Sequence, residues 1–303
     1  MLLIVLACTP SGPATLPTFL GGNDGLSIVF DKNSPPAEVF DGGDFPFDIV
    51  VRLENKGEYF IPKDLVTVSV VGILPQLFNL QEADMHRSPD EDLVERKVDS
   101  TGKVIEPGLV FAEFKNFNHV SFITGNSELS QFIAEVCYQY GTKAATSLCV
   151  RKNLANPEEG GLCEIDGTRP VASSGAPVQV TEVREFQRGK ESIGFTFTIK
   201  HTGPTTGRIF ALGSRCAGGR TTEDLAHVKV TSDVPGLSCQ GLSTTREGAV
   251  EGLMPIYEGE RVVTCTQRIG SPADYELPIR IDAQYDYRDS VRTDVLVKHS
   301  PDE

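Results

Sequence analysis

The chain has 303 residues, about twice the ~150 residues of a typical domain, so we expect two domains that can each bury a core. Its 42 acidic residues outnumber its 28 Lys and Arg residues, and the net charge of −14 argues against nucleic-acid binding, because phosphates require a basic surface. No stretch approaches the roughly 18 consecutive apolar residues that a membrane-spanning helix needs.

The chain begins with an apolar run at residues 2–6, followed by Ala7 and Cys8. This resembles the end of a prokaryotic lipoprotein signal peptide, in which a small residue precedes the cysteine that receives the lipid. The run is shorter than the usual ~7–15 residues and lacks a basic region, so a plain secretion signal, an unprocessed apolar tail or a first strand remain alternatives. We therefore predict a signal-like segment at 1–8, with Cys8 as the candidate lipid anchor. A flexible tether rich in Pro, Gly, Ser and Thr follows at 9–25.

Residues 26–152 read as a first β module. Short alternating runs of apolar residues predict its strands, and a charged stretch at 81–100 predicts an exposed loop or short helix. The expected strands are 26–30, 45–54, 66–71 and 104–117, followed by a hairpin over 132–150.

Residues 153–176 contain several Gly and Pro residues and predict a linker, after which 177–300 read as a second β module. Sustained helical periodicity is missing outside the charged stretch, so we expect little helix. The expected strands of this module are 178–183, 194–200, 208–212, 227–230, 261–268, 277–287 and 292–297.

The two modules repeat each other in sequence. Two pairs of segments recur in the same order at offsets of 146 and 147 positions, which indicates a tandem duplication. The matching residues are Phe47, Ile49, Val51, Leu53 and Gly57 with Ile193, Phe195, Phe197, Ile199 and Gly203, and Phe132, Ala134, Val136, Tyr138 and Tyr140 with Ile279, Ile281, Ala283, Tyr285 and Tyr287.

About seven short strands in each module are typical of an immunoglobulin-like sandwich. Residues 47–57 read Phe-Asp-Ile-Val-Val-Arg-Leu-Glu-Asn-Lys-Gly, a long strand ending in Asn-x-Gly that resembles CARDB and similar immunoglobulin-like domains. The phrases at 137–142 and 175–178 are similar to two-module envelope proteins of small-genome archaea. The second module departs from the pattern, since His201-Thr202-Gly203 replaces Asn-x-Gly. The resemblance implies an all-β fold of two tandem immunoglobulin-like β-sandwich domains at the cell surface, and it implies no activity.

Apart from Cys8, the chain has six cysteines, an even number that predicts three disulfides outside the cytoplasm. They lack the close C-x-x-C spacing of zinc sites, and they allow 15 connectivities. We expect Cys137–Cys149 across the predicted hairpin, Cys239–Cys265 between successive strands of the second module, and Cys163–Cys216 between the modules.

The sequence shows no catalytic constellation, so we expect a protein that is not an enzyme and needs no cofactor. The histidines are scattered and predict surface or turn positions: His86, His119, His201, His227 and His299. Solvated turn acids are favoured over a calcium site for Asp41, Asp44 and Asp48. Two interpretations remain for the four tyrosines of the repeated strands, Tyr138, Tyr140, Tyr285 and Tyr287: an exposed sugar-binding face, or packing in a core or rim.

Two functions follow from these observations. The first is a structural building unit of the cell surface that assembles with itself or other envelope proteins into a filament or surface layer, through strand addition, with residues 2–6 or 16–20 as donor. The second is a lipid-anchored extracellular module that binds polysaccharide or a partner protein with loops at one end of the sandwich.

Overall fold

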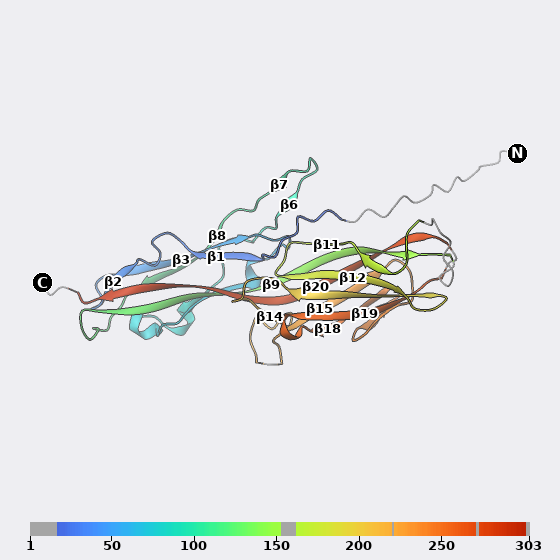
Figure 1. The fold of residues 1–303 in the computed structure, drawn as a ribbon. Helices are drawn as coiled ribbons and strands as arrows, with labels where there is room; N and C mark the ends of the chain where they lie inside the picture. The colour runs from blue at the N-terminus through green and yellow to red at the C-terminus, as the bar shows by residue number, and fades with distance from the viewer. Residues whose placement is uncertain (1–16, 153–161, 220, 271–272, 301–303) are drawn as a thin grey trace.

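The computed structural model describes residues 17–152, 162–219, 221–270 and 273–300. In these ranges the protein is all-β, with four short 3-10 helices and no α-helix. The molecule is elongated, and two strands run along most of its length (Figure 1). The short helices are η1 (Lys63–Leu65), η2 (Pro75–Phe78), η3 (Glu82–Met85) and η4 (Tyr257–Gly259).

The two long strands, β9 (Ser127–Val150) and β20 (Tyr275–Lys298), have 24 residues each. They pair antiparallel over their whole length, from Tyr275 opposite Val150 to Lys298 opposite Ser127. They form the centre of a ten-stranded sheet. Its other members are β2 (Glu38–Phe40), β4 (Val66–Val71), β5 (His86–Arg87), β11 (Val171–Ser173), β14 (Arg208–Phe210), β15 (Leu225–Ser232), β17 (Ser243–Arg246) and β18 (Ala249–Pro255).

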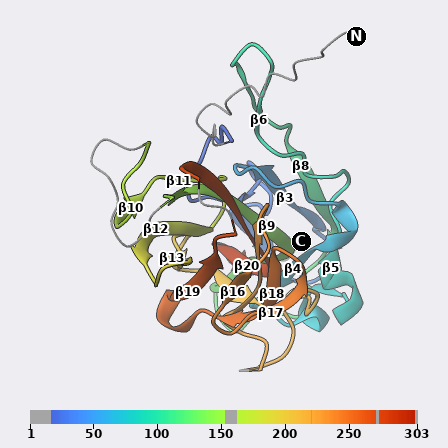
Figure 2. The same ribbon diagram turned by 90° about the vertical axis from the view of Figure 1, so that its right-hand side faces the viewer.

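Two smaller sheets cover one face of this central sheet. Alternate residues of β9 are buried from Phe132 to Val150, so the same face is covered in both halves. The first sheet contains β1 (Leu26–Phe30), β3 (Phe47–Asn55) and β8 (Val110–Phe117), and the second contains β10 (Gly167–Arg169), β12 (Val178–Gln187), β13 (Ser192–His201), β16 (Leu237–Cys239) and β19 (Glu260–Arg268). The twist of the long strands turns one small sheet relative to the other in the end view (Figure 2). A separate hairpin of β6 (Lys97–Val98) and β7 (Val104–Ile105) stands off the body (Figure 1).

Alternation of apolar and polar residues explains why these segments form strands. In β3, Phe47, Ile49, Val51 and Leu53 are buried and the residues between them are more exposed. β-Branched and aromatic residues fill such half-buried strands well. The buried side chains of both small sheets and the central sheet join into one continuous hydrophobic cluster.

The same arrangement of strands occurs twice. Strand β3 lies between β1 and β8, and β13 lies between β12 and β19. Leu26 of β1 pairs with Asn55, just as Val178 of β12 pairs with His201 at the equivalent position. In the central pair, Gln139 lies opposite Asp286, which is also 147 positions later in the chain. An approximate two-fold axis therefore passes through this pair, at the waist of the molecule.

The predicted hairpin over 132–150 is wrong, and so is the corresponding break at 288–291, because β9 and β20 continue through both segments. The polar residues in the middle are held in the sheet. Thr142 is buried and its hydroxyl donates to the Val178 carbonyl at 2.5 Å, while the ring of Tyr59 lies against Gly141. Each sandwich consequently contains part of the long strand of the other repeat. The predicted linker at 153–176 is not a linker throughout, because residues 167–169 and 171–173 form strands β10 and β11. The central sheet extends across both repeats.

Candidate functional site

All six cysteines after Cys8 form disulfides, and only one of the expected pairs is correct. Cys239–Cys265 joins β16 to β19 as expected, whereas Cys137 pairs with Cys216 and Cys149 pairs with Cys163. The expected Cys137–Cys149 bridge fails because both residues lie on one continuous strand, and the expected Cys163–Cys216 bridge fails because each is bonded to one of them. Cys137–Cys216 connects the two repeats across the waist. Cys8 lies outside the described residues.

The four paired tyrosines lie at the waist and are buried, so they pack in the core and do not form an exposed sugar-binding face. Tyr138 lies opposite Tyr287 with ring centroids 5.6 Å apart, and Tyr140 lies opposite Tyr285 at 6.4 Å. Along each strand the neighbouring rings meet edge to face. Such contacts stabilise a core beyond the burial of area alone. Burial raises the pKa of all four hydroxyls, so they stay neutral and must find hydrogen-bond partners.

Equivalent turns of the two repeats hold two of these hydroxyls. The Tyr140 hydroxyl donates to Asn55 Oδ1 at 3.3 Å, and the Tyr287 hydroxyl lies 2.7 Å from His201 Nε2. His201 thus replaces the asparagine of the first repeat and keeps its contact. Burial lowers the pKa of His201, which favours the neutral imidazole at this position.

The glycines of these turns allow the tyrosine hydroxyls to approach the backbone. A Cβ atom at Gly57 would overlap the Tyr140 hydroxyl, and one at Gly203 would lie 2.6 Å from the Tyr287 hydroxyl. The repeated Gly57 and Gly203 therefore have a packing role at the waist that their sequence context did not reveal. The signal available in the sequence was their nearly equal offset from the paired tyrosines, 83 positions from Gly57 to Tyr140 and 84 from Gly203 to Tyr287.

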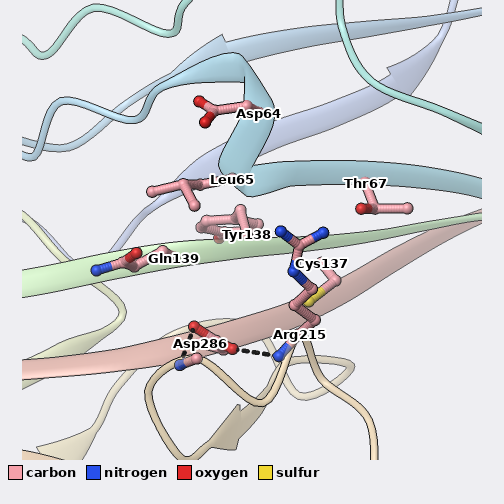
Figure 3. A pocket seen from close by; sticks show the side chains of 9 residues that line it. Asp64, Leu65, Thr67, Cys137, Tyr138, Gln139, Arg215 and Asp286 are labelled. Carbon is pink, nitrogen blue, oxygen red and sulfur yellow. Dashed lines mark hydrogen bonds between the residues drawn. The ribbon is translucent and has the colours of Figure 1, made fainter.

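A cavity of about 280 Å³ lies on the outer face of the central sheet beside the Cys137–Cys216 disulfide (Figure 3). Its walls come from both repeats, with Asp64 above and Arg215 below in this view. Asp286 is buried in its floor and accepts hydrogen bonds from the backbone N–H groups of Gly213 and Arg215, at 3.2 and 2.6 Å. This carboxylate therefore fixes the loop that carries Cys216.

A second cavity of about 270 Å³ lies farther along the same pair of strands, at Gly141 and Lys143 of β9. It is lined by the ring of Tyr59 and by polar side chains that include Lys143, His227 and Gln284. Tyr59 packs against Tyr140 with centroids 5.4 Å apart, which fixes its ring. The cavity combines an aromatic side chain with hydrogen-bonding groups.

The five histidines do not gather at one site, and His299 alone of the three described next contacts a turn acid. His86 lies 2.8 Å from the Ser69 hydroxyl, and His299 lies 2.9 Å from Asp41. The surface position predicted for His119 is wrong, because its ring is buried against Phe78. Burial would raise the pKa of Asp41, but N–H groups of Ser300 and Ile123 and the charge of His299 lower it to about 2.

The three acids considered for calcium do not form one site, because two of them accept hydrogen bonds in different places and the third is exposed. Asp41 accepts a hydrogen bond from the Ser300 N–H, Asp48 accepts one from the Asn116 N–H at 2.9 Å, and Asp44 is exposed. In the described ranges no group of three or more His, Cys, Asp or Glu side chains is arranged to hold a metal ion.

The sequence analysis missed one buried ion pair, between Glu185 and Arg169 at 2.5 Å. Both carboxylate oxygens of Glu185 also accept from the Cys149 N–H, at 3.0 and 2.9 Å. Burial raises the pKa of Glu185 to about 6, although the Cys149 N–H and Arg169 act in the opposite direction. Isolated charges in the sequence gave no sign that these two would meet inside the second sandwich.

No protein-family model matches the chain, and no curated protein matches its sequence. The resemblance to CARDB domains therefore stays a prediction. None of the short helices in the described part of the chain is long and apolar enough to cross a membrane.

Proposed function

We propose that this protein is a non-enzymatic structural protein of the cell surface, a rigid building unit that assembles with copies of itself through strand addition. The observation that carries the proposal is the pairing of β9 with β20 across both sandwiches. A 24-residue strand extends about 80 Å, so the pair forms a continuous spine. Bending at the waist would break ladder hydrogen bonds and separate the four buried tyrosines, which favours a rod over two hinged domains.

Disulfide placement supports the same reading. Cys137–Cys216 fastens the second repeat to β9 of the first, and Cys149–Cys163 fastens the segment that follows β9. Disulfides persist in oxidising compartments, which supports a location outside the cytoplasm. The buried acids Asp41 and Glu185 accept hydrogen bonds from backbone N–H groups and pair with neighbouring basic side chains, so their role is to hold neighbouring segments together.

Electron microscopy and sedimentation of the purified full-length chain test this proposal. We expect ordered filaments or layers whose repeat matches the length of the rod, and labelling of intact cells with an antibody. A chain that remains monomeric at every concentration, or that is found in the cytoplasm, would rule out the building-unit role.

The cavity at Tyr59 favours a second candidate, an extracellular module that binds polysaccharide. Sugars stack on aromatic rings and bond to amide, imidazole and ammonium groups, and Tyr59, Gln284, His227 and Lys143 offer these. Calorimetry with envelope polysaccharides should show binding that a Gln284→Ala variant loses. Lipid anchoring would be tested by comparing membrane retention of the Cys8→Ser variant with that of the unaltered chain.

A further inference from the structure

The second repeat contains a short strand that closes one side of its sandwich. Strand β11 pairs antiparallel with β9, with Ala172 opposite Ala145. It also lies beside β12, whose Val180 N–H reaches the Ser173 hydroxyl at 3.4 Å. β11 thus fills the space between the edge of the central sheet and the edge of the smaller sheet.

The equivalent position in the first repeat holds no strand among the described residues. The outer edge of β20 pairs with β14 up to Arg288 and with β2 from Leu296 onward. Between them, Arg292 is the equivalent of Ala145, 147 positions later. Among the described residues, the edge of β20 that faces away from β9 pairs with β15, β14 and β2, and none of these three strands reaches the segment 289–295.

The backbone of this segment points its hydrogen-bonding groups outward. The Leu296 N–H donates to the Ala37 carbonyl at 2.9 Å, and the Lys298 carbonyl accepts from the Asp41 N–H at 3.0 Å. Alternate residues of a strand direct their N–H and C=O groups to the same edge. Arg292 lies four residues before Leu296 and six before Lys298, so its N–H and C=O point to the same edge, toward the vacant position.

Strand β1 forms the opposite wall, and its free edge is unprotected. Its sequence Leu-Ser-Ile-Val-Phe has no charge and no proline, and Ile28 and Phe30 are only partly buried against the core. Natural edge strands usually carry charges that discourage pairing. The other edge of the same sheet follows this rule, because β8 carries the ion pair of Glu113 and Lys115 at 3.1 Å.

Side chains inside the vacant position also lack cover. Val291 is half-buried against the core, whereas its equivalent in the second repeat, Ala144, is 3% exposed. Val291, Ile28 and Phe30 are the partly exposed apolar groups that a β11-like strand would bury, since β1 and β20 lie beside each other.

The repeat indicates which part of the chain is suited to this position. In the second repeat, β11 comes immediately before β12, so its counterpart would come immediately before β1. The described residues there run elsewhere: the N–H groups of Leu20 and Gly21 donate to the Glu58 carboxylate, and the Gly22 carbonyl accepts from the Ala176 N–H. This path places residues 20–22 between Glu58 of the first repeat and Ala176 at the start of the second, and they do not pair with β20.

We propose that residues 2–6 of a second copy, Leu-Leu-Ile-Val-Leu, add as a strand between β1 and β20 of the first repeat. The proposal rests on the self-assembly put forward above and assigns its acceptor and its donor. The donor is apolar and uncharged, which matches the uncharged edge of β1 and the exposed faces of Val291, Ile28 and Phe30. Each copy has one donor and one acceptor, so the contact is head to tail and produces an open chain of molecules.

Mixing two variants, a substitution in the acceptor and a deletion of the donor, tests this assignment. Val291→Lys introduces a charge into the acceptor and leaves the donor intact, and deletion of residues 2–6 removes the donor and leaves the acceptor intact. We expect each variant alone to be monomeric by sedimentation, and an equimolar mixture to form a heterodimer that grows no further. Leu129→Lys is the matched control, because Leu129 is 63% exposed on the outer face of β9 and its variant should assemble as the unaltered chain does.

The outcomes separate this inference from the proposed function. If the unaltered chain assembles and Val291→Lys assembles equally well, the acceptor assignment is overturned while the building-unit role stands. If the deletion variant assembles, the donor assignment is overturned. If the unaltered chain is monomeric, both proposals fall. Should Val291→Lys lose its near-ultraviolet circular dichroism, Arg292→Pro replaces it, because proline removes the outward N–H and leaves the ladder with β9 in place.

Discussion

Removing the inter-repeat disulfide provides the most direct test of the waist. Cys137→Ala with Cys216→Ala opens a loop that spans 79 positions, and Cys149→Ala with Cys163→Ala opens one that spans 14. The loss of chain entropy in the unfolded state predicts about 4.5 kcal/mol for the longer loop and about 3 kcal/mol for the shorter one. The first double variant should therefore lose more of its free energy of unfolding, by about 1.5 kcal/mol.

Guanidinium unfolding of the oxidised protein, followed by tyrosine fluorescence and far-ultraviolet circular dichroism, measures both losses. The tyrosine signal reports on the waist, where the longer loop is closed. In the unaltered chain, the unfolding transition measured by tyrosine fluorescence should coincide with the one measured by circular dichroism. The control is Cys239→Ala with Cys265→Ala, whose 26-position loop predicts an intermediate loss of about 3.5 kcal/mol. A larger loss for the shortest loop would refute the entropic reasoning, and a negligible loss for the Cys137 pair would refute its role in joining the repeats.

Three further predictions concern single side chains. Gly57→Ala should lower the free energy of unfolding by about 2 kcal/mol or more, because the added methyl group overlaps the Tyr140 hydroxyl; equal stability in urea unfolding would contradict the packing described. His201→Ala should lose about 1–2 kcal/mol by leaving the buried Tyr287 hydroxyl unpaired, whereas His201→Asn should retain most of it, and thermal unfolding of both variants compares them. Because the folded-state pKa of Glu185 is raised from 4.5 to about 6, its effect on stability is most favourable below pH 4.5 and falls by about 2 kcal/mol as the pH rises through 6. The Glu185→Gln variant should lack that decline, and parallel pH slopes for the two proteins would show that the carboxyl does not titrate in this range.

The residues at the waist show how much of a site can be predicted from sequence patterns. The paired tyrosines and the Asn55 and His201 turns were visible as repeated positions, but their contacts were not. Asn55 is 85 positions from Tyr140 and His201 is 86 from Tyr287, so only the folded chain brings them together. The replacement of asparagine by histidine looked like a departure from the pattern, yet it preserves a bond to the tyrosine hydroxyl, because both side chains present a polar atom at similar reach.

The sequence by itself determined the all-β class, the two repeats and the positions of most strands, because alternation of apolar residues is a local property that one buried face imposes on a strand. It also identified the cysteines that are oxidised, since their even number depends only on composition. The tertiary structure decided what depends on distant partners. Tyr59 and the Val178 carbonyl decided whether residues 141–143 form a turn or continue the strand, because they hold Gly141 and Thr142 in an extended conformation. The continuation of β9 and of β20 replaced one expected hairpin and one expected break by a single pair of long strands, separated Cys137 from Cys149 along one strand and joined the two sandwiches.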